Sequence, residues 1–182
     1  MTILTIPVSS RDHIQGPATA PVTLLEYGDY ECPYCGAAFP IVKQVQQRLG
    51  DQLRFVFRNF PLSTVHPHAQ QAAEAAETAG TQGKFWEMHD TLFEHQRALD
   101  TPSLLQYAQS LGVNVEQFER DLLSQTVAER VREDFLSGIR SGVNGTPTFF
   151  INGRRHEGSY DRETLLAALE QAASLHEGMA PL

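Results

Sequence analysis

Cysteine is scarce in this sequence. The 182-residue chain contains two, Cys32 and Cys35, which lie three positions apart. A small secreted domain held by disulfides carries four or more cysteines at wide separations, because a bridge stabilises chiefly by closing a long loop. A bridge between Cys32 and Cys35 would close almost no loop. A disulfide scaffold is therefore excluded, and the search for function starts at this pair.

Positive charge is also scarce. The chain has 14 lysine and arginine side chains against 22 aspartates and glutamates, which gives a net charge of -8. The lysines are Lys43 and Lys84 alone. Such a sequence offers no basic stripe for a phosphate backbone or for an anionic membrane surface. We therefore expect no nucleic acid and no membrane among its partners.

Long apolar runs are missing as well. The longest, residues 20–25 and 147–151, fall well short of the ~18 residues that a membrane-spanning helix needs. Residues 1–10 contain no lysine or arginine, and Thr5 and Pro7 interrupt their short apolar run, so the plan of a signal peptide is absent. We expect a cytoplasmic protein, unless Met1 was added to a mature form whose signal had been removed.

The composition is that of a soluble globular domain, with 41% hydrophobic and 20% charged residues. Residues 22–27 are apolar and β-branched, which is typical of a buried strand, and Glu26 lies near its end. Apolar residues at helical spacing follow Cys35 as far as Leu49. Residues 52–60 alternate like a second strand. Strand, helix and strand in this order indicate a βαβ unit with parallel strands.

The middle of the chain has helical character. Alanine, glutamine and glutamate dominate residues 69–79, and apolar residues then recur at helical spacing, so we expect at least four helices before Gly142. Thr101-Pro102 resembles an N-cap followed by proline at the first helical position. Asn114 with Gln117 resembles a capping box.

The end of the chain returns to strands. Asn152-Gly153 between residues 148–151 and 154–156 predicts a two-residue hairpin, and Asp161 can cap a last helix. The predicted fold class is α/β, with the order β-α-β then β-β-α. Residues 1–62 and 143–182 would form this domain, with an inserted all-helical subdomain at residues 63–142.

The cysteine pair falls where the predicted first helix begins. The N–H groups of a first helical turn have no intrahelical partner, and the aligned peptide dipoles favour a negative charge there. Cys32 is therefore the candidate nucleophile. Cys35, one turn further along, can attack a mixed disulfide on Cys32 and is the candidate resolving thiol. Pro33 is compatible with a helix start.

Other interpretations of the pair stay open. It could be half of a zinc site, although no second C-x-x-C or matching histidine pair is present. It could also be a structural bridge or two inert buried thiols. The pair His66 and His68 is interpreted as capping or surface residues rather than as metal ligands. Arg58, on the second strand, could meet Glu26 or the helical insertion, or be solvated.

Four further stretches carry a resemblance to a known family. They are residues 20–27 (APVTLLEY), 57–62 (FRNFPL), 83–90 (GKFWEMHD) and 145–149 (GTPTF). Together with the Cys32-Pro33-Tyr34-Cys35 motif, they make the sequence resemble the thioredoxin superfamily, and most closely its DsbA-like thiol-disulfide oxidoreductases. The resemblance implies a thioredoxin-like fold.

The resemblance also implies roles for individual residues. Cys32 would be the exposed nucleophile, Cys35 its buried partner, and Pro147 a cis proline facing the sulfurs. Thr146 would offer main-chain hydrogen bonds to an extended substrate.

Three further positions take roles from the same resemblance. Pro33 and Tyr34 would complete the substrate-binding surface. Glu26 would be a buried acid that accepts the proton of Cys35, and burial would raise its pKa; the alternative is a glutamate that reaches water at the strand end.

The sequence therefore predicts a disulfide reductase, isomerase or oxidase that forms a mixed disulfide on Cys32. The Pro33-Tyr34 dipeptide, which is associated with glutaredoxins, favours a reductase or isomerase. Its partners would be protein disulfides or dithiols, or small thiols such as glutathione, and no cofactor or metal is expected. The alternatives are a non-catalytic module that binds a peptide or a metal on the same fold, and a glutathione-dependent transferase or isomerase.

Overall fold

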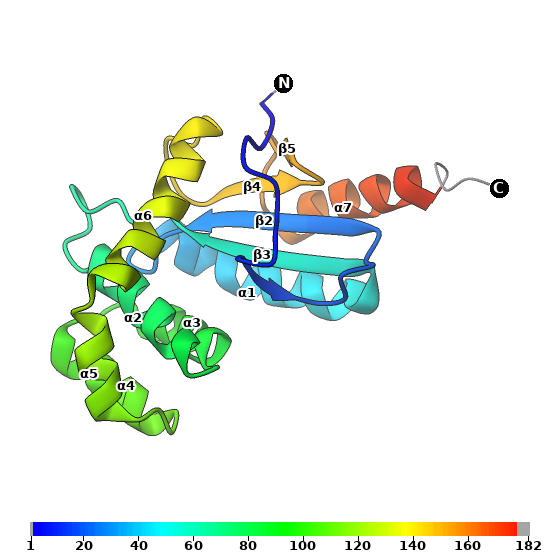
Figure 1. Cartoon of the computed structure of the whole chain (residues 1–182). Helices are drawn as coiled ribbons and strands as arrows, with labels where there is room; N and C mark the ends of the chain where they lie inside the picture. Colours follow the sequence, from blue (N-terminus) through cyan, green and yellow to red (C-terminus); the bar gives the residue numbers. More distant parts are fainter. Residues whose placement is uncertain (1, 178–182) are drawn as a thin grey trace.

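A mixed sheet forms the centre of the protein (Figure 1). The structure is a computed structural model, and it describes residues 2–177. The strands are β1 (His13–Gln15), β2 (Val22–Gly28), β3 (Leu53–Asn59), β4 (Thr148–Ile151) and β5 (Arg154–Arg155). Their order across the sheet is β1-β3-β2-β4-β5. Only β2 and β3 pair in parallel, from Val22 opposite Leu53 to Gly28 opposite Asn59.

The predicted βαβ unit is confirmed. Helix α1 (Pro33–Leu49) connects β2 to β3 through a short 3-10 turn, η1 (Gly50–Gln52). Its buried residues recur at helical spacing, as the sequence indicates, and Pro40 lies inside the helix. Together with the β4–β5 hairpin and the last helix, this order gives the predicted α/β fold class.

Helices cover both faces of the sheet (Figure 1). Helices α1 and α7 (Arg162–Glu177) pack on one face, and α6 (Gln125–Arg140) packs against β3 on the other. Side chains that alternate along β2 point to the two faces of the sheet and belong to two different apolar clusters. Leu24 belongs to the larger cluster, whereas Leu25 and Tyr27 belong to the smaller one. Both central strands are therefore buried on both faces.

Five helices lie between β3 and β4 in the described residues, which agrees with the expected minimum of four. They are α2 (Ala69–Thr81), α3 (Phe85–Glu94), α4 (Thr101–Ser110), α5 (Val115–Leu122) and α6. We call residues 63–142 the helical block; that it is a subdomain of its own stays a prediction. Of the predicted second part of the main domain, residues 178–182 lie outside the described residues.

The caps differ in detail from the sequence expectations. Asp100, not Thr101, is the N-cap of α4, because its carboxylate accepts a hydrogen bond from the N–H of Ser103 at 3.0 Å. Asn114 does cap α5 through the N–H of Gln117 at 2.9 Å. The reciprocal bond of a capping box comes instead from Gln82, the residue that follows α2: the Asn114 N–H donates to its Oε1.

The predicted hairpin and its turn are confirmed. Asn152 has φ 46° and Gly153 has φ 77°, the two positive angles that a type I′ turn requires. Asp161 accepts from the N–H of Thr164 at 3.0 Å at the start of α7. The turn also closes on β2, since the N–H of Thr23 donates to Oδ1 of Asn152.

Arg58 has a partner that the sequence did not indicate. Strand β1 pairs with β3 and brings the N-terminal segment over Arg58, which is 2% exposed. The guanidinium donates to both carboxylate oxygens of Asp12, at 2.7 and 3.1 Å, and to the hydroxyl of Tyr27. Burial alone would raise the pKa of Asp12, but Arg58, together with the N–H of Ser9 and with Arg130, outweighs it and lowers this pKa. Arg58 is not solvated and does not bond Glu26, but it does lie beside the helical block, because it lines a pocket together with residues of α6.

This ion pair generates a prediction. Replacing Asp12 by Ala leaves a buried guanidinium without its counter-charge, and we expect the free energy of unfolding to fall by about 3 kcal/mol. Chemical denaturation measures it. The control is Asp51→Ala on the exposed η1 turn, for which the change should stay within about 0.5 kcal/mol. Equal effects of the two substitutions would contradict the importance of the pair.

Candidate active site

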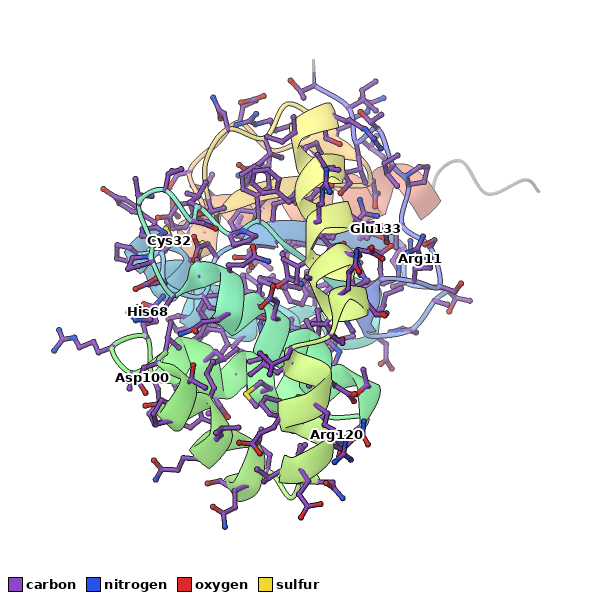
Figure 2. All side chains as sticks on the ribbon, turned by 60° about the vertical axis from the view of Figure 1, so that its left-hand side comes forward. Arg11, Cys32, His68, Asp100, Arg120 and Glu133 are labelled. Atoms are coloured by element: carbon purple, nitrogen blue, oxygen red, sulfur yellow. The ribbon has the colours of Figure 1, made fainter. Side chains whose placement is uncertain are left out.

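Cys32 is the residue that caps α1. Its backbone is extended (φ -71°, ψ 122°), Pro33 opens the helix, and the Cys32 carbonyl accepts the first helical bond from Gly36 at 3.0 Å. Proline suits this position because its missing N–H would have no intrahelical partner. The Cys32 sulfur is therefore held at the positive end of a 17-residue helix. Figure 2 shows Cys32 on the same side of the molecule as His68.

The surroundings of Cys32 favour its thiolate. The largest effect on the pKa of Cys32 is the hydrogen bond that the thiol of Cys35 donates to its sulfur, which lowers this pKa. Burial raises the pKa, whereas hydrogen bonds from Thr146 and from the N–H groups of Cys35 and Tyr34 lower it further. These effects lower the pKa of Cys32 from 9.0 to about 5. At neutral pH the sulfur is an anion, which is the nucleophilic form.

The sulfur is less accessible than the sequence resemblance implies. Cys32 is 3% exposed, so the expectation of an exposed nucleophile is wrong for this structure. The physical reason is the backbone of Thr146, whose carbonyl oxygen lies 3.5 Å from the Cys32 sulfur. The neighbouring Pro33 and Tyr34 are exposed, Tyr34 by 66%.

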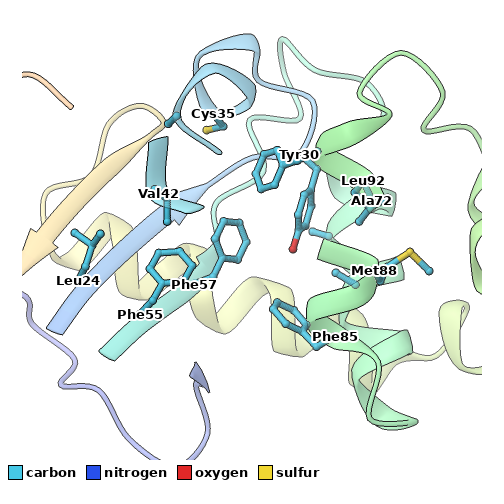
Figure 3. Close-up of a cluster of buried hydrophobic side chains, with 14 of the residues drawn as sticks. Leu24, Tyr30, Cys35, Val42, Phe55, Phe57, Ala72, Phe85, Met88 and Leu92 are labelled. Carbon is cyan, nitrogen blue, oxygen red and sulfur yellow. The ribbon is translucent and has the colours of Figure 1, made fainter. Parts of the chain in front are cut away.

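Cys35 is fully buried, as expected. Figure 3 shows it beside the apolar cluster that includes Val42, Phe57 and Tyr30. The N–H of Asp29 donates to its sulfur at 3.4 Å. Burial raises the pKa of the Cys35 thiol well above the ordinary value, and the nearby Cys32 and Glu26 raise it further. The two sulfurs thus differ in charge at neutral pH although only two residues lie between the cysteines.

Glu26 lies buried in β2, 3% exposed, and does not reach water at the strand end. Its Oε1 has no hydrogen-bond partner among the described residues. Burial first, and the charge on Cys32 second, raise its pKa from 4.5 to about 8. Gly28 leaves the room for this carboxyl: a Cβ there would lie 2.4 Å from the ring of Phe57 and 3.2 Å from Oε1.

Thr146 and Pro147 reach the cysteines from the segment that leads into β4. The peptide bond between them is cis, and Thr148 begins β4 directly afterwards. The hydroxyl of Thr146 is buried, and a hydrogen bond from this side chain lowers the pKa of Cys32. The structure therefore brings Cys32, Cys35, Glu26 and Thr146 together. The roles assigned to Thr146, Pro147, Pro33 and Tyr34 in substrate binding stay predictions.

Sequence reasoning missed two acid–histidine pairs beside the cysteines. Nδ1 of His66 lies 2.7 Å from Oδ2 of Asp29, and Nδ1 of His68 lies 2.9 Å from Oε1 of Glu31. The acids precede Cys32, and the histidines lie in the loop that enters α2. The sequence signal for these pairs was the equal spacing: the two acids lie two positions apart, and so do the two histidines. This spacing predicts the pairs only if the contact between the two loops is already known.

Two negative findings concern the part of the chain that the structure describes. Residues 2–177 contain no group of three or more His, Cys, Asp or Glu side chains placed to hold a metal ion. No helix in this range has the length and apolar character needed to cross a bilayer.

Comparison with known proteins links this geometry to a family. A family model described as "Thioredoxin" matches residues 9–171. A thioredoxin-like oxidoreductase from Silicibacter pomeroyi is 26% identical, with a TM-score of 0.80, over 94% of this chain and 95% of that one. BdbD from Bacillus subtilis, solved in its oxidised form, is 25% identical, with a TM-score of 0.83, over 95% and 98% of the two chains. The fold is also that of alpha-DsbA1 from Wolbachia pipientis (17% identity, TM-score 0.83, 96% of each chain).

Curated relatives with higher identity are longer proteins. The chain is 51% identical over 170 residues to the Na(+)/H(+) antiporter NhaA 1 of Salinispora arenicola, which covers 93% of this chain and 26% of the relative. The corresponding antiporter of a Mycobacterium species is 46% identical, over 88% of this chain and 26% of the relative. The chain thus spans about a quarter of the length of these relatives.

The site geometry predicts how the two sulfurs depend on each other. Cys35→Ala removes the thiol that most lowers the pKa of Cys32, so this pKa should rise by about 1. Cys35→Ser keeps a hydroxyl donor, and its effect should be smaller. The ultraviolet absorbance of the thiolate, followed against pH in folded reduced protein, gives both midpoints. Identical midpoints in the alanine variant and the wild type would contradict this arrangement.

Proposed function

The chain belongs to the thioredoxin family, and from this premise we propose that it is a thiol-disulfide oxidoreductase acting through a mixed disulfide on Cys32. The observation that carries the proposal is the Cys32 sulfur at the start of α1, with its pKa lowered to about 5 and the thiol of Cys35 against it. The protein from Silicibacter pomeroyi, which has a similar fold and 26% identity, is itself described as an oxidoreductase. The antiporter name belongs to relatives four times as long, and the proposal does not rest on it.

The first step is attack by the Cys32 thiolate on one sulfur of a substrate disulfide. A bond forms between Cys32 and that sulfur as the substrate S–S bond breaks, and the second substrate sulfur leaves as a thiolate. Thiolates of low pKa leave readily, so the mixed disulfide on Cys32 is also easily reversed. An extended substrate segment would pair with the backbone of Thr146, whose carbonyl lies beside the Cys32 sulfur.

The second step requires Cys35 to lose its proton. The Cys35 thiolate then attacks the Cys32 sulfur, the bond to the substrate breaks, and a Cys32–Cys35 disulfide remains. Two electrons have passed to the substrate; the reverse sequence oxidises a substrate dithiol. Glu26 is the buried base available to Cys35, and its negative form helps to raise the pKa of that thiol. In the mixed disulfide Cys32 carries no charge, so only burial still raises the pKa of Glu26.

The lowered pKa of Cys32 supports a preferred direction. A stabilised thiolate makes the reduced protein more stable and its disulfide a stronger oxidant. A pKa of about 5 lies between the ~7 of thioredoxin and the ~3.5 of a strong disulfide donor. We therefore propose that the protein donates or rearranges disulfides more readily than it reduces them, a more oxidising role than its Pro33-Tyr34 dipeptide suggests.

Activity assays test the proposal. Wild-type protein should accelerate both the oxidative refolding of a reduced disulfide protein and the reshuffling of a scrambled one, and Cys32→Ser should abolish both activities. Cys35→Ser should accumulate a mixed disulfide, visible by mass spectrometry. Inactivity of the wild type, together with stoichiometric zinc in the purified protein or tight binding of a peptide without turnover, would favour a binding module instead.

Glu26 gives a prediction on the pH dependence. Glutathione disulfide first forms a mixed disulfide with Cys32, and the second release of glutathione then reports the attack by Cys35. In the wild type this release should speed up with pH and level off below pH 8, because Glu26 ionises more readily once Cys32 has lost its charge in the mixed disulfide. Glu26→Gln should slow it by about tenfold or more at pH 7, and its rate should keep rising above pH 8. The exposed Glu87→Gln is the control; superimposable profiles for Glu26→Gln and wild type would remove Glu26 from the reaction.

A further inference from the structure

We propose that Gln96, in the connection between α3 and α4, is a positioning residue of the cysteine pair, through which the helical block sets the affinity of Cys32 for its proton. The inference deepens the proposed function and depends on it. Gln96 belongs to neither of the two segments that supply the cysteines and the Thr146-Pro147 pair. It contacts the backbone of the turn that delivers Cys32 to α1.

The contacts of Gln96 are specific. Its Nε2 donates to the carbonyl oxygen of Tyr30 at 2.8 Å and to that of Cys32 at 2.9 Å. The amide group thus donates both of its hydrogens to carbonyls that lie two positions apart, on either side of Glu31. These residues form the last turn before the helix, so the amide fixes the backbone from which the Cys32 side chain leaves.

The first turn of α1 is shaped to admit this amide. A Cβ on Gly36 would lie 2.0 Å from Oε1 of Gln96 and 3.0 Å from its Nε2. Gly36 does not have a positive φ, so its backbone does not call for glycine. The missing side chain is explained by the space that the Gln96 amide occupies next to the cysteines.

The position of Gln96 is itself determined by the helical block. Two residues further on, the carbonyl of Ala98 accepts from the hydroxyl of Tyr107 on α4 at 2.8 Å, and Leu99 is buried. Three residues before it, Phe93 on α3 packs against the ring of Tyr30 with centroids 4.8 Å apart. The amide is therefore presented by anchored structure and is not a free surface side chain.

The consequence for the sulfur follows from its place at the helix cap. The Cys32 carbonyl already accepts the first helical N–H, and the Gln96 amide adds a second donor that fixes the direction of this oxygen. The partial positive charge of the amide also lies within the turn that carries the thiolate. Without Gln96, the carbonyl oxygens of Tyr30 and Cys32 each lose one donor, the cap loosens, and the anion should be less well stabilised.

The test is Gln96→Leu, which keeps the volume and removes both donors. We expect the midpoint of the Cys32 thiolate titration to rise by about 0.5 to 1. The equilibrium constant with glutathione should shift by about three- to tenfold towards the protein disulfide, because the reduced form loses stability. Gln82→Leu is the matched control: Gln82 also bonds the backbone of another segment twice, through Asn114, far along the helical block. It should leave both values unchanged.

A double-mutant cycle protects the test against a folding defect. Gly36→Ala should displace the amide of Gln96 and reproduce the shift in the Cys32 titration that Gln96→Leu causes. When Gly36→Ala is added to Gln96→Ala, the titration should differ little from that of Gln96→Ala alone, because no amide remains to be displaced. Shifts in both single variants and non-additivity in the pair support the proposal. Wild-type values in folded Gln96→Leu, or equal shifts in Gln82→Leu, overturn it, and so does a Gly36→Ala effect that persists without Gln96. Absence of exchange activity in the wild type would instead reject the proposed function.

Discussion

The start of α1 is the constraint on which the rest of this structure depends. A helix of 17 residues presents N–H groups without intrahelical partners, and Cys32 stands where they meet the end of β2. The sheet helps to hold this junction. Because β2 and β3 run parallel, α1 must begin at the end of the sheet where β2 stops and return to the opposite end, where β3 starts. Thr146, which precedes an adjacent antiparallel strand, arrives at the end where β2 stops.

Burial favours the neutral form of three ionisable groups of this site, but the three pKa values end up differently. It holds the Cys35 thiol and the Glu26 carboxyl in their neutral forms, because neither has enough polar partners to offset the loss of water. Cys32 is almost as buried, yet the thiol of Cys35, Thr146 and two N–H groups reverse the effect on its pKa. One low-dielectric site therefore holds a nucleophile and a stored proton beside each other, which is the division of roles that thiol-disulfide exchange needs.

Much of this arrangement could be predicted from the sequence, because it depends on residues that are close together along the chain. The strand before the cysteines, the helix after them, the Asn152-Gly153 turn and the helical character of the middle all come from short-range periodicity and turn chemistry. The partners of Arg58, Asp29 and Cys32 could not be predicted in this way. Asp12, His66 and Gln96 lie 46, 37 and 64 residues from them, in loops whose approach depends on the packed helical block.

The central claim is that Cys32 is an anion at neutral pH while Cys35 keeps its proton. The most direct measurement is alkylation of the reduced protein by iodoacetamide across pH, with the modified cysteine identified by mass spectrometry. The account predicts that Cys32 reacts already at pH 6 and that Cys35 stays unmodified throughout the neutral range. Alkylation that begins only near pH 9, or that modifies both cysteines equally, would contradict it.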